Sequence, residues 1–294
     1  MSTSLTRKLT LTDLRRARAP GAPKLPMLTC YDYTSARLMQ EAGVPALLVG
    51  DSASNVVLGY PTTLPVSLGF MIEIAAAVRR GAPLAFVVAD MPFGSYHGSR
   101  ARGVRNVVRM VQRTGCDCVK LEVAPTQLDL VRELAGAGVA VMAHLGLRPQ
   151  AVGLAGGYRT QGRTAEEARA ILALSLQMQK AGAAALLLEA VPAEVARLVV
   201  DATNVPVIGC GAGPYCHGHV FVTHDALGLT PAAPRFAPQL GDLATPSIAA
   251  YCEYVRQVAA GEYPAAEHQY GMPADELAKI LHDEVPGAVS KAYE

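Results

Sequence analysis

Short runs of aliphatic residues alternate along this chain with longer stretches in which apolar residues recur every three or four positions. These longer stretches predict amphipathic helices, and 164–182 begins with Thr164 and Glu167 at the spacing of a capping box. The aliphatic runs predict eight buried strands, at 26–32, 46–52, 84–92, 118–123, 139–146, 184–190, 206–213 and 219–228. Regular strand–helix alternation predicts a sheet of parallel strands joined by right-handed crossovers.

Eight strand–helix units favour a closed (β/α)8 barrel, the TIM barrel, over an open doubly wound sheet. The open sheet is the alternative, although no glycine-rich phosphate-binding sequence follows the first predicted strand. No linker-like segment interrupts residues 24–228. We therefore predict a single α/β domain over residues 1–294, with an N-terminal helix at about 10–18 and C-terminal helices at about 245–290.

Composition and charge narrow the function. The chain is 51% hydrophobic and 17% charged, which suits parallel strands buried on both faces. Its formal net charge of +1 offers no basic field for nucleic acid or anionic lipid, and its longest apolar run, 181–191, is too short to cross a bilayer. The N-terminus lacks the apolar core of a signal peptide, and six scattered cysteines suit free thiols. We expect a cytoplasmic enzyme with a small substrate and no nucleic-acid or membrane partner.

Polar side chains occupy the carboxyl ends of most predicted strands. Because the active site of a (β/α)8 barrel forms at these ends, we expect the side chains to face one cavity and to satisfy one another there. In chain order they are Tyr31, Asp32, Asp51, Ser52, Asp90, Lys120, Glu122, His144 and Glu189.

Two pairs of charged residues at these ends predict particular chemistry. Asp51 and Asp90 end neighbouring strands, and two carboxylates with few fixed cations nearby suit Mg²⁺, although either aspartate alone could be a helix N-cap. Lys120 and Glu122 lie two residues apart and share one face of a strand. A lysine that points into the cavity can bind a substrate carboxylate, and an ordinary salt bridge at the strand end is the alternative.

Glu189 is the candidate general base. Its aliphatic neighbours should raise the pKa of its carboxyl group toward neutrality, and the alternative role is a cap for the following helix. His144 is a further candidate, with a satisfied core histidine as its alternative.

Three other patterns are weaker. The glycine turn at 209–213 resembles a phosphate cradle but fits a turn of close approach better, because the lysine and serine of a phosphate-binding loop are missing. His217 and His219 resemble a metal pair without a third ligand at useful spacing. The glycine-rich segment 154–163 is long for a barrel connection and predicts a lid over the site.

The strand ends and their surroundings resemble the ketopantoate hydroxymethyltransferase (3-methyl-2-oxobutanoate hydroxymethyltransferase) family. Matching segments run in family order from about 27 to 268: TCYDYTSA, VGDS, TLPVS, AVRRGAP, ADMPF, VKLE, HLGLRPQ, GGYRTQGR, LLLEAVPAE, PVIGCGAG, HDALGLT, PRFA and YPAAEH. The resemblance implies a (β/α)8 barrel of the phosphoenolpyruvate/pyruvate superfamily, usually a homodecamer, which uses Mg²⁺ and 5,10-methylenetetrahydrofolate. It implies hydroxymethyl transfer to 3-methyl-2-oxobutanoate, giving ketopantoate (2-dehydropantoate) for pantothenate and coenzyme A synthesis.

The resemblance also assigns roles to matching positions. Asp51 and Asp90 would ligate Mg²⁺, with Glu122 supporting the metal site. Glu189 would remove the C3 proton of the 2-oxo acid, and the metal would stabilise the enolate that results. Ser52 and Lys120 would hold the substrate carboxylate. The full set of implied substrate-binding positions is Asp51, Ser52, Asp90, Lys120, Tyr31 and His144.

The chain departs from the family pattern around the expected site. The departing residues are Ala53, Ser54, Pro61, Glu73, Ile74, His217 and His219, and the tail after about 270 lies beyond the resemblance. None of them is an expected catalytic residue. A paralogue that hydroxymethylates another 2-oxo acid is therefore an alternative, as is a Mg²⁺-dependent aldolase or lyase of the same superfamily. A binding protein without turnover would be expected to lack Glu189 or an aspartate.

Overall fold

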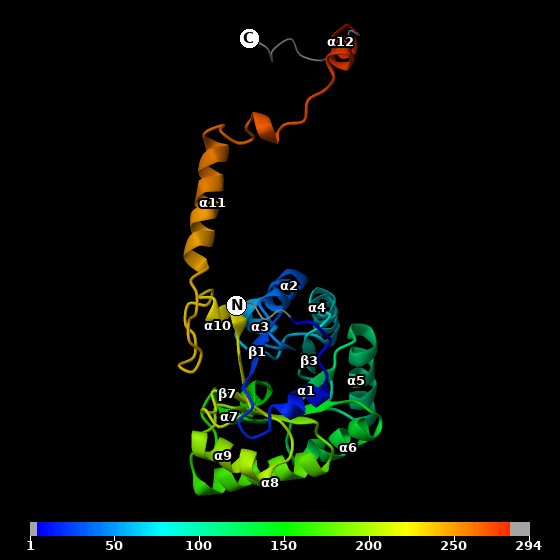
Figure 1. Ribbon diagram of the computed structural model, residues 1–294, viewed down its shortest axis with the longest axis vertical. Helices are drawn as coiled ribbons and strands as arrows, with labels where there is room; N and C mark the ends of the chain where they lie inside the picture. Colours follow the sequence, from blue (N-terminus) through cyan, green and yellow to red (C-terminus); the bar gives the residue numbers. More distant parts are fainter. Residues whose placement is uncertain (1–4, 283–294) are drawn as a thin grey trace. The chain divides into compact units, whose positions relative to one another are not determined.

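Eight parallel strands form a closed barrel in the order β1 to β8, with β8 pairing back onto β1 (Figure 1). This computed structural model describes residues 5–282. The predicted strands are confirmed, and each is shorter than its aliphatic run. They are β1 (Leu25–Thr29), β2 (Ala46–Val49), β3 (Phe86–Asp90), β4 (Cys118–Glu122), β5 (Val141–Gly146), β6 (Ala185–Glu189), β7 (Val207–Cys210) and β8 (Gly218–Phe221).

The strands are aliphatic throughout because both of their faces are buried. One row of alternate side chains, which includes Phe86, Val88 and Leu187, packs inside the barrel, and the other row packs against the surrounding helices. The N-terminal helix α1 (Leu11–Arg16) adds Leu14, which is 1% exposed, to the inner cluster. The helix predicted at about 10–18 is therefore part of the barrel's core.

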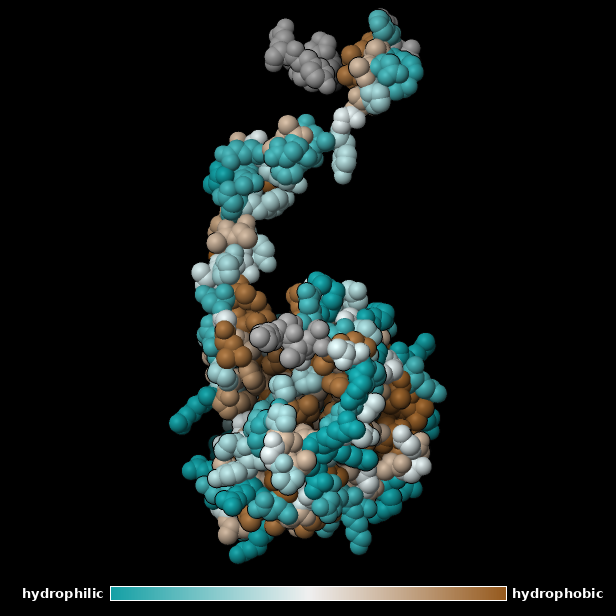
Figure 2. Space-filling model, viewed as in Figure 1, coloured by the Kyte–Doolittle hydropathy of each residue, from teal (hydrophilic) through white to brown (hydrophobic). Residues whose placement is uncertain are grey.

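Helices follow most strands and cover the outside of the barrel. The longer ones are α2 (Tyr33–Glu41), α4 (Leu68–Gly81), α5 (Arg100–Thr114), α6 (Leu128–Gly136), α8 (Ala165–Lys180) and α9 (Ala193–Ala202). The short ones are α3 (Ala53–Val56), α7 (Val152–Ala155), α10 (Thr223–Ala226), η1 (Pro125–Gln127) and η2 (Pro149–Ala151). The side chains of Asp32, Ser67 and Thr164 cap the N-termini of α2, α4 and α8. Asp32 is therefore an ordinary helix N-cap. The surface facing the viewer in Figure 2 is mostly hydrophilic, as amphipathic outer helices require.

The chain divides into two compact units, Met1–Gly241, which contains the barrel, and Asp242–Glu294. The second unit contains α11 (Ala244–Ala259), η3 (Ala266–His268) and α12 (Ala274–His282), and none of these three helices has a buried residue. Part of the helical range predicted at about 245–290 lies outside the described residues. The prediction of one domain over the whole chain stays a prediction. Among the residues described, no helix is long and apolar enough to cross a membrane.

Candidate active site

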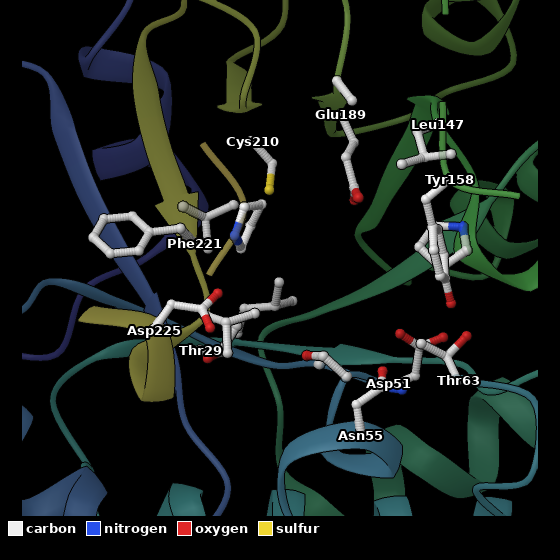
Figure 3. Close-up of a pocket in the computed structure, with 18 of the residues that line it drawn as sticks. Thr29, Asp51, Asn55, Thr63, Leu147, Tyr158, Glu189, Cys210, Phe221 and Asp225 are labelled. Carbon is white, nitrogen blue, oxygen red and sulfur yellow. The ribbon is translucent and has the colours of Figure 1, made fainter. Parts of the chain in front are cut away.

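A cavity of about 680 Å³ opens at the carboxyl ends of the strands. Figure 3 shows Asp51 and Glu189 extending into it from different sides. Most of the residues predicted from the strand ends line this cavity: Asp51, Ser52, Asp90, Lys120, Glu122, His144 and Glu189. The structure therefore brings together groups that come from five strand ends spread over 139 residues of the chain (51 to 189).

Strand periodicity explains why charged groups gather here. Along β3 the inward row runs Phe86, Val88, Asp90, so the two apolar residues fill the barrel and the third enters the cavity. The ladder then sets the neighbours across strands, because Asp90 is in register with Lys120 and Glu122 with His144.

Asp51, Asp90 and Lys120 form one contact group. The backbone N–H of Asp51 donates to Asp90 Oδ2 at 3.0 Å, and the Lys120 ammonium lies 3.1 Å from the same oxygen. Burial raises the pKa of the Asp90 carboxyl, and the Lys120 charge opposes that rise. Burial also disfavours the Lys120 ammonium, but the surrounding carboxylates, Asp90 first, outweigh it and raise the pKa of Lys120. Lys120 is thus a fixed cation inside an acidic cavity.

The two aspartates fit a magnesium site. Asp90 Oδ1 is buried and has no hydrogen-bond partner, so one carboxylate oxygen is available for a ligand. Mg²⁺ is commonly held by one or two carboxylates, with substrate oxygens and water completing the octahedron. No group of three or more His, Cys, Asp or Glu side chains in the described part of the chain is arranged to hold a metal ion. Asp51 and Asp90 as metal ligands, with Glu122 supporting them, stay a prediction.

Glu122 is held by Gln150 and Tyr96, which the sequence analysis did not predict as site residues. The backbone N–H of Gln150 donates to both Glu122 oxygens, at 3.0 and 3.2 Å, and the Gln150 side-chain amide donates to Asp51 Oδ2 at 2.7 Å. Tyr96 donates its hydroxyl to Gln150 Oε1 at 2.9 Å. Gln150 lies within the matched HLGLRPQ segment, but its contacts depend on residues far away in the sequence.

His144 lies between Lys120 and Glu189. Its Nδ1 is 3.0 Å from Lys120 Nζ, which can only donate, so Nδ1 accepts and the ring proton is on Nε2. Burial, followed by the Lys120 charge, lowers the pKa of His144 well below its usual value, so the ring is neutral. Nε2 lies 3.3 Å from Glu189 Oε2 but makes no hydrogen bond of acceptable geometry there.

Glu189 ends β6 with an 18% exposed side chain. Burial raises the pKa of its carboxyl to about 7, against the opposing Lys120 charge. Its backbone is held by Gly146 of β5, which is in register with it, and its carbonyl accepts the Leu147 N–H at 2.8 Å. A carboxylate with this pKa on a rigid strand end has the properties of a general base near neutral pH.

Tyr31 takes a different place from its neighbours. It is buried beside the site and is absent from the cavity lining, and its hydroxyl lies 2.8 Å from Ser52 Oγ. Tyr31 thus contacts Ser52, which does line the cavity. Its role in substrate binding stays a prediction.

Two segments outside the strands also line the cavity. Tyr158, Arg159 and Thr160 belong to the predicted lid, and a loop after α10 contributes Thr230, Ala232, Ala233, Pro234 and Phe236. Gly211 has φ +66, and a Cβ there would lie 2.6 Å from the Phe236 ring. The glycine turn is thus a place of close approach, as the weaker pattern predicted.

The histidine pair lies outside the cavity. His217 and His219 are absent from its lining, and His217 Nδ1 accepts the Val207 backbone N–H at 3.0 Å. Ser54, another departure from the family pattern, is buried and donates its hydroxyl to the Thr62 carbonyl at 2.7 Å. His217 and Ser54 therefore each make a hydrogen bond within the fold.

Known proteins match this chain over most of its length. The family described as ketopantoate hydroxymethyltransferase matches residues 8–266. A 3-methyl-2-oxobutanoate hydroxymethyltransferase from Deinococcus radiodurans is 44% identical over 93% of this chain and 97% of its own length. One of the same name from Heliobacterium modesticaldum is 42% identical over 91% and 97%.

Solved structures share the fold at low sequence identity. A 2,3-dimethylmalate lyase, described as a PEP mutase/isocitrate lyase superfamily member, superposes with a TM-score of 0.56 at 19% identity, over 92% of this chain and 98% of that one. The phosphoenolpyruvate phosphomutase of Streptomyces platensis subsp. rosaceus gives a TM-score of 0.58 at 14% identity, over 93% and 95%. The predicted barrel class is confirmed by these neighbours.

Proposed function

This chain belongs to the ketopantoate hydroxymethyltransferase family, and we therefore propose that it transfers a hydroxymethyl group to 3-methyl-2-oxobutanoate, giving ketopantoate for pantothenate synthesis. We propose 5,10-methylenetetrahydrofolate as the one-carbon donor and Mg²⁺ as the cation. The observation that carries the proposal is a single cavity that holds Glu189, with its pKa raised to about 7, together with Asp51, Asp90 and Lys120.

The chain's own residues divide the work. Lys120 and Ser52 hold the carboxylate of the 2-oxo acid, and Glu189 accepts the C3 proton. Asp51 and Asp90 would hold Mg²⁺, which would supply Lewis-acid polarisation of the 2-oxo group and so acidify C3. The resulting C3 carbanion attacks the methylene carbon of the folate, and water then releases ketopantoate and tetrahydrofolate. His144 is neutral, and its Nε2 lies 3.3 Å from Glu189 Oε2.

We propose that the enzyme acts in the cytoplasm as a homo-oligomer, a decamer on the family resemblance, with small-molecule partners only. The nearly neutral formal charge of +1 supports the absence of nucleic-acid and lipid partners. The exposed apolar residues of α11 support self-association, because such residues are commonly covered in an assembly.

The test separates proton removal from one-carbon transfer. The protein is incubated with Mg²⁺ and 3-methyl-2-oxobutanoate in deuterium oxide, and loss of the C3 proton signal is followed by NMR before methylenetetrahydrofolate is added. We expect exchange first and ketopantoate after the folate is added. Exchange without ketopantoate would contradict the proposed one-carbon transfer and indicate a different reaction partner for the 2-oxo acid. Absence of exchange would contradict proton removal from C3 and thus the proposed enzyme.

A further inference from the structure

We infer that Gln150 is a positioning residue, which fixes the carboxylates of Asp51 and Glu122 in the orientation needed for a divalent cation. The inference rests on the proposed function for the presence of that cation. Gln150 belongs to η2, just after β5, and is only 5% exposed. It bonds to residues at the carboxyl ends of three other strands, β2, β3 and β4.

Every polar group of the Gln150 side chain is used. Its Nε2 donates to Asp51 Oδ2 at 2.7 Å and to the Met91 carbonyl at 3.0 Å, and its Oε1 accepts the Tyr96 hydroxyl at 2.9 Å. A flipped amide would place its oxygen against a carboxylate and a carbonyl, which are both acceptors. The Asp51 carboxylate and the Met91 carbonyl therefore set the direction of the amide, and the hydroxyl of Tyr96, itself 3% exposed, satisfies the amide oxygen.

The same residue acts on the second carboxylate through its backbone. The Gln150 N–H donates to both oxygens of Glu122, while the Tyr96 hydroxyl accepts the Glu122 backbone N–H at 3.1 Å. Gln150 and Tyr96 thus hold Glu122 at its backbone and at its carboxylate, and hold Asp51 at one oxygen. Asp51 Oδ2 has no other hydrogen bond within the described part of the chain.

A comparison within the chain separates this role from ordinary packing. Gln127, in η1 after β4, also uses its side-chain oxygen in a local cap, accepting the Ala124 N–H at 2.8 Å. It contacts no carboxylate, and it does not line the cavity. Gln150 instead orients two acidic groups in a buried site, as the outer partners of metal ligands do, and loss of such a partner typically weakens metal binding by about 10–100-fold.

The test measures cation affinity directly. Mn²⁺, a spectroscopic substitute for Mg²⁺, is titrated into the full-length protein, and free Mn²⁺ is followed by electron paramagnetic resonance. We expect Gln150→Met, which keeps the length of the side chain and the backbone bond to Glu122 but removes the side-chain hydrogen bonds, to raise the Mn²⁺ Kd by about 10–100-fold. Gln127→Met is the matched control and should leave the Kd unchanged.

Tyr96→Phe provides an independent variant that keeps the ring and its packing. It should weaken Mn²⁺ binding less than Gln150→Met does, because the amide keeps its bonds to Asp51 and Met91 and loses only the bond to Tyr96. In the double variant, the two losses should be less than additive, since Tyr96 acts partly through the amide and partly through its own bond to the Glu122 backbone. Circular dichroism confirms that each variant is folded, and the Tyr96→Phe result decides the question if Gln150→Met does not fold.

Particular results would overturn the inference. Wild-type Mn²⁺ affinity in folded Gln150→Met would do so, as would fully additive losses in the double variant or the absence of Mn²⁺ binding in the wild type. Failure of the proposed function is distinguishable, because a wild type that binds Mn²⁺ through Gln150 and forms no ketopantoate would refute the reaction and leave the positioning role intact.

Discussion

At the scale of residues, Glu189 combines burial with a fixed place opposite the acidic pair. We expect Glu189→Gln to abolish deuterium exchange at C3 of 3-methyl-2-oxobutanoate, because the amide cannot accept the proton. Binding of the 2-oxo acid, measured by calorimetry, should change little, since Lys120 and Ser52 are unaltered. Glu194→Gln, an exposed acid in the first turn of α9, is the control. Strong residual exchange in Glu189→Gln would assign the base to another residue.

The raised pKa of Glu189 also predicts the pH profile of exchange. The base must be ionised to act, so the exchange rate should fall as pH decreases below about 7, where the carboxyl becomes protonated. The profile is measured by NMR in deuterium oxide, with the Lys120 ammonium charged throughout the range. A rate that stays constant down to pH 5 would show that Glu189 is not the titrating group.

The same shift predicts how stability depends on pH. Because burial raises the pKa of Glu189 from 4.5 to about 7, the folded state binds the proton more tightly than the unfolded state. Glu189 therefore contributes stability that is fully present below pH 4.5 and is lost as pH rises through about 7. The loss is on the order of 3 kcal/mol. Urea unfolding at pH 5 and pH 8 should show a loss of stability that is larger in the wild type than in Glu189→Gln by about this amount, since Asp90 titrates in both proteins.

Residue identity predicted much of the site, and contacts across the fold decided the rest. Asp51, Asp90, Lys120 and Glu189 could be predicted because charged residues at the ends of aliphatic strands are costly unless they face a cavity. Gln150 could not be singled out, because its importance comes from Asp51, 99 residues away, and is not visible in the local pattern.

At the scale of elements, Gly146 makes the join between β5 and β6 possible. It has φ +89, and a Cβ there would lie 2.3 Å from the Glu189 carbonyl oxygen. We expect Gly146→Ala to lose more stability than the positive φ alone costs, which is about 1–2 kcal/mol, and to lower kcat by displacing Glu189. Urea unfolding and product assays check both effects.

Gly138→Ala is the matched control for this change. Gly138 has φ +83, similar to Gly146, but nothing lies within 4 Å of its added Cβ. This variant should show the backbone strain alone, with normal kcat. Equal losses of stability in the two variants, with normal kcat in both, would show that the contact between Gly146 and Glu189 is unimportant.

Element positions followed from hydrophobic periodicity, but element ends did not. The last predicted strand, 219–228, ends at Phe221, and α10 begins at Thr223. Thr223 bonds to Thr29, donating its backbone N–H to Thr29 Oγ1 at 2.9 Å and its hydroxyl to the Thr29 carbonyl. These partners are 194 residues apart, so a local sequence pattern cannot place this boundary.

At the scale of the whole molecule, α11 carries a row of exposed apolar residues, which includes Ile248, Tyr251, Val255 and Val258. We expect this row to be covered by a second copy of the chain in the homo-oligomer. Changing Tyr251 and Val255 together to aspartate should therefore lower the native mass measured by light scattering. The same mass as the wild type would contradict this place for the interface.

Ala249→Asp is the control for the oligomer experiment, because Ala249 lies on the opposite side of the same helix, near Glu253 and Arg256. It should leave the native mass unchanged.

The sequence predicted the barrel class because eight strand–helix repeats favour closure, whereas how many copies assemble depends on surfaces that no periodic pattern marks.

Two kinds of backbone line the cavity. Asp90 and Glu189 lie on hydrogen-bonded strand ends, whereas Ala232, Ala233 and Phe236 lie on a loop. Substitutions in that loop can enlarge the space beside the substrate without shifting any proton-transferring group. Laboratory evolution toward bulkier branched keto acids should therefore accumulate its changes in the loop, and the acidic floor should remain as it is.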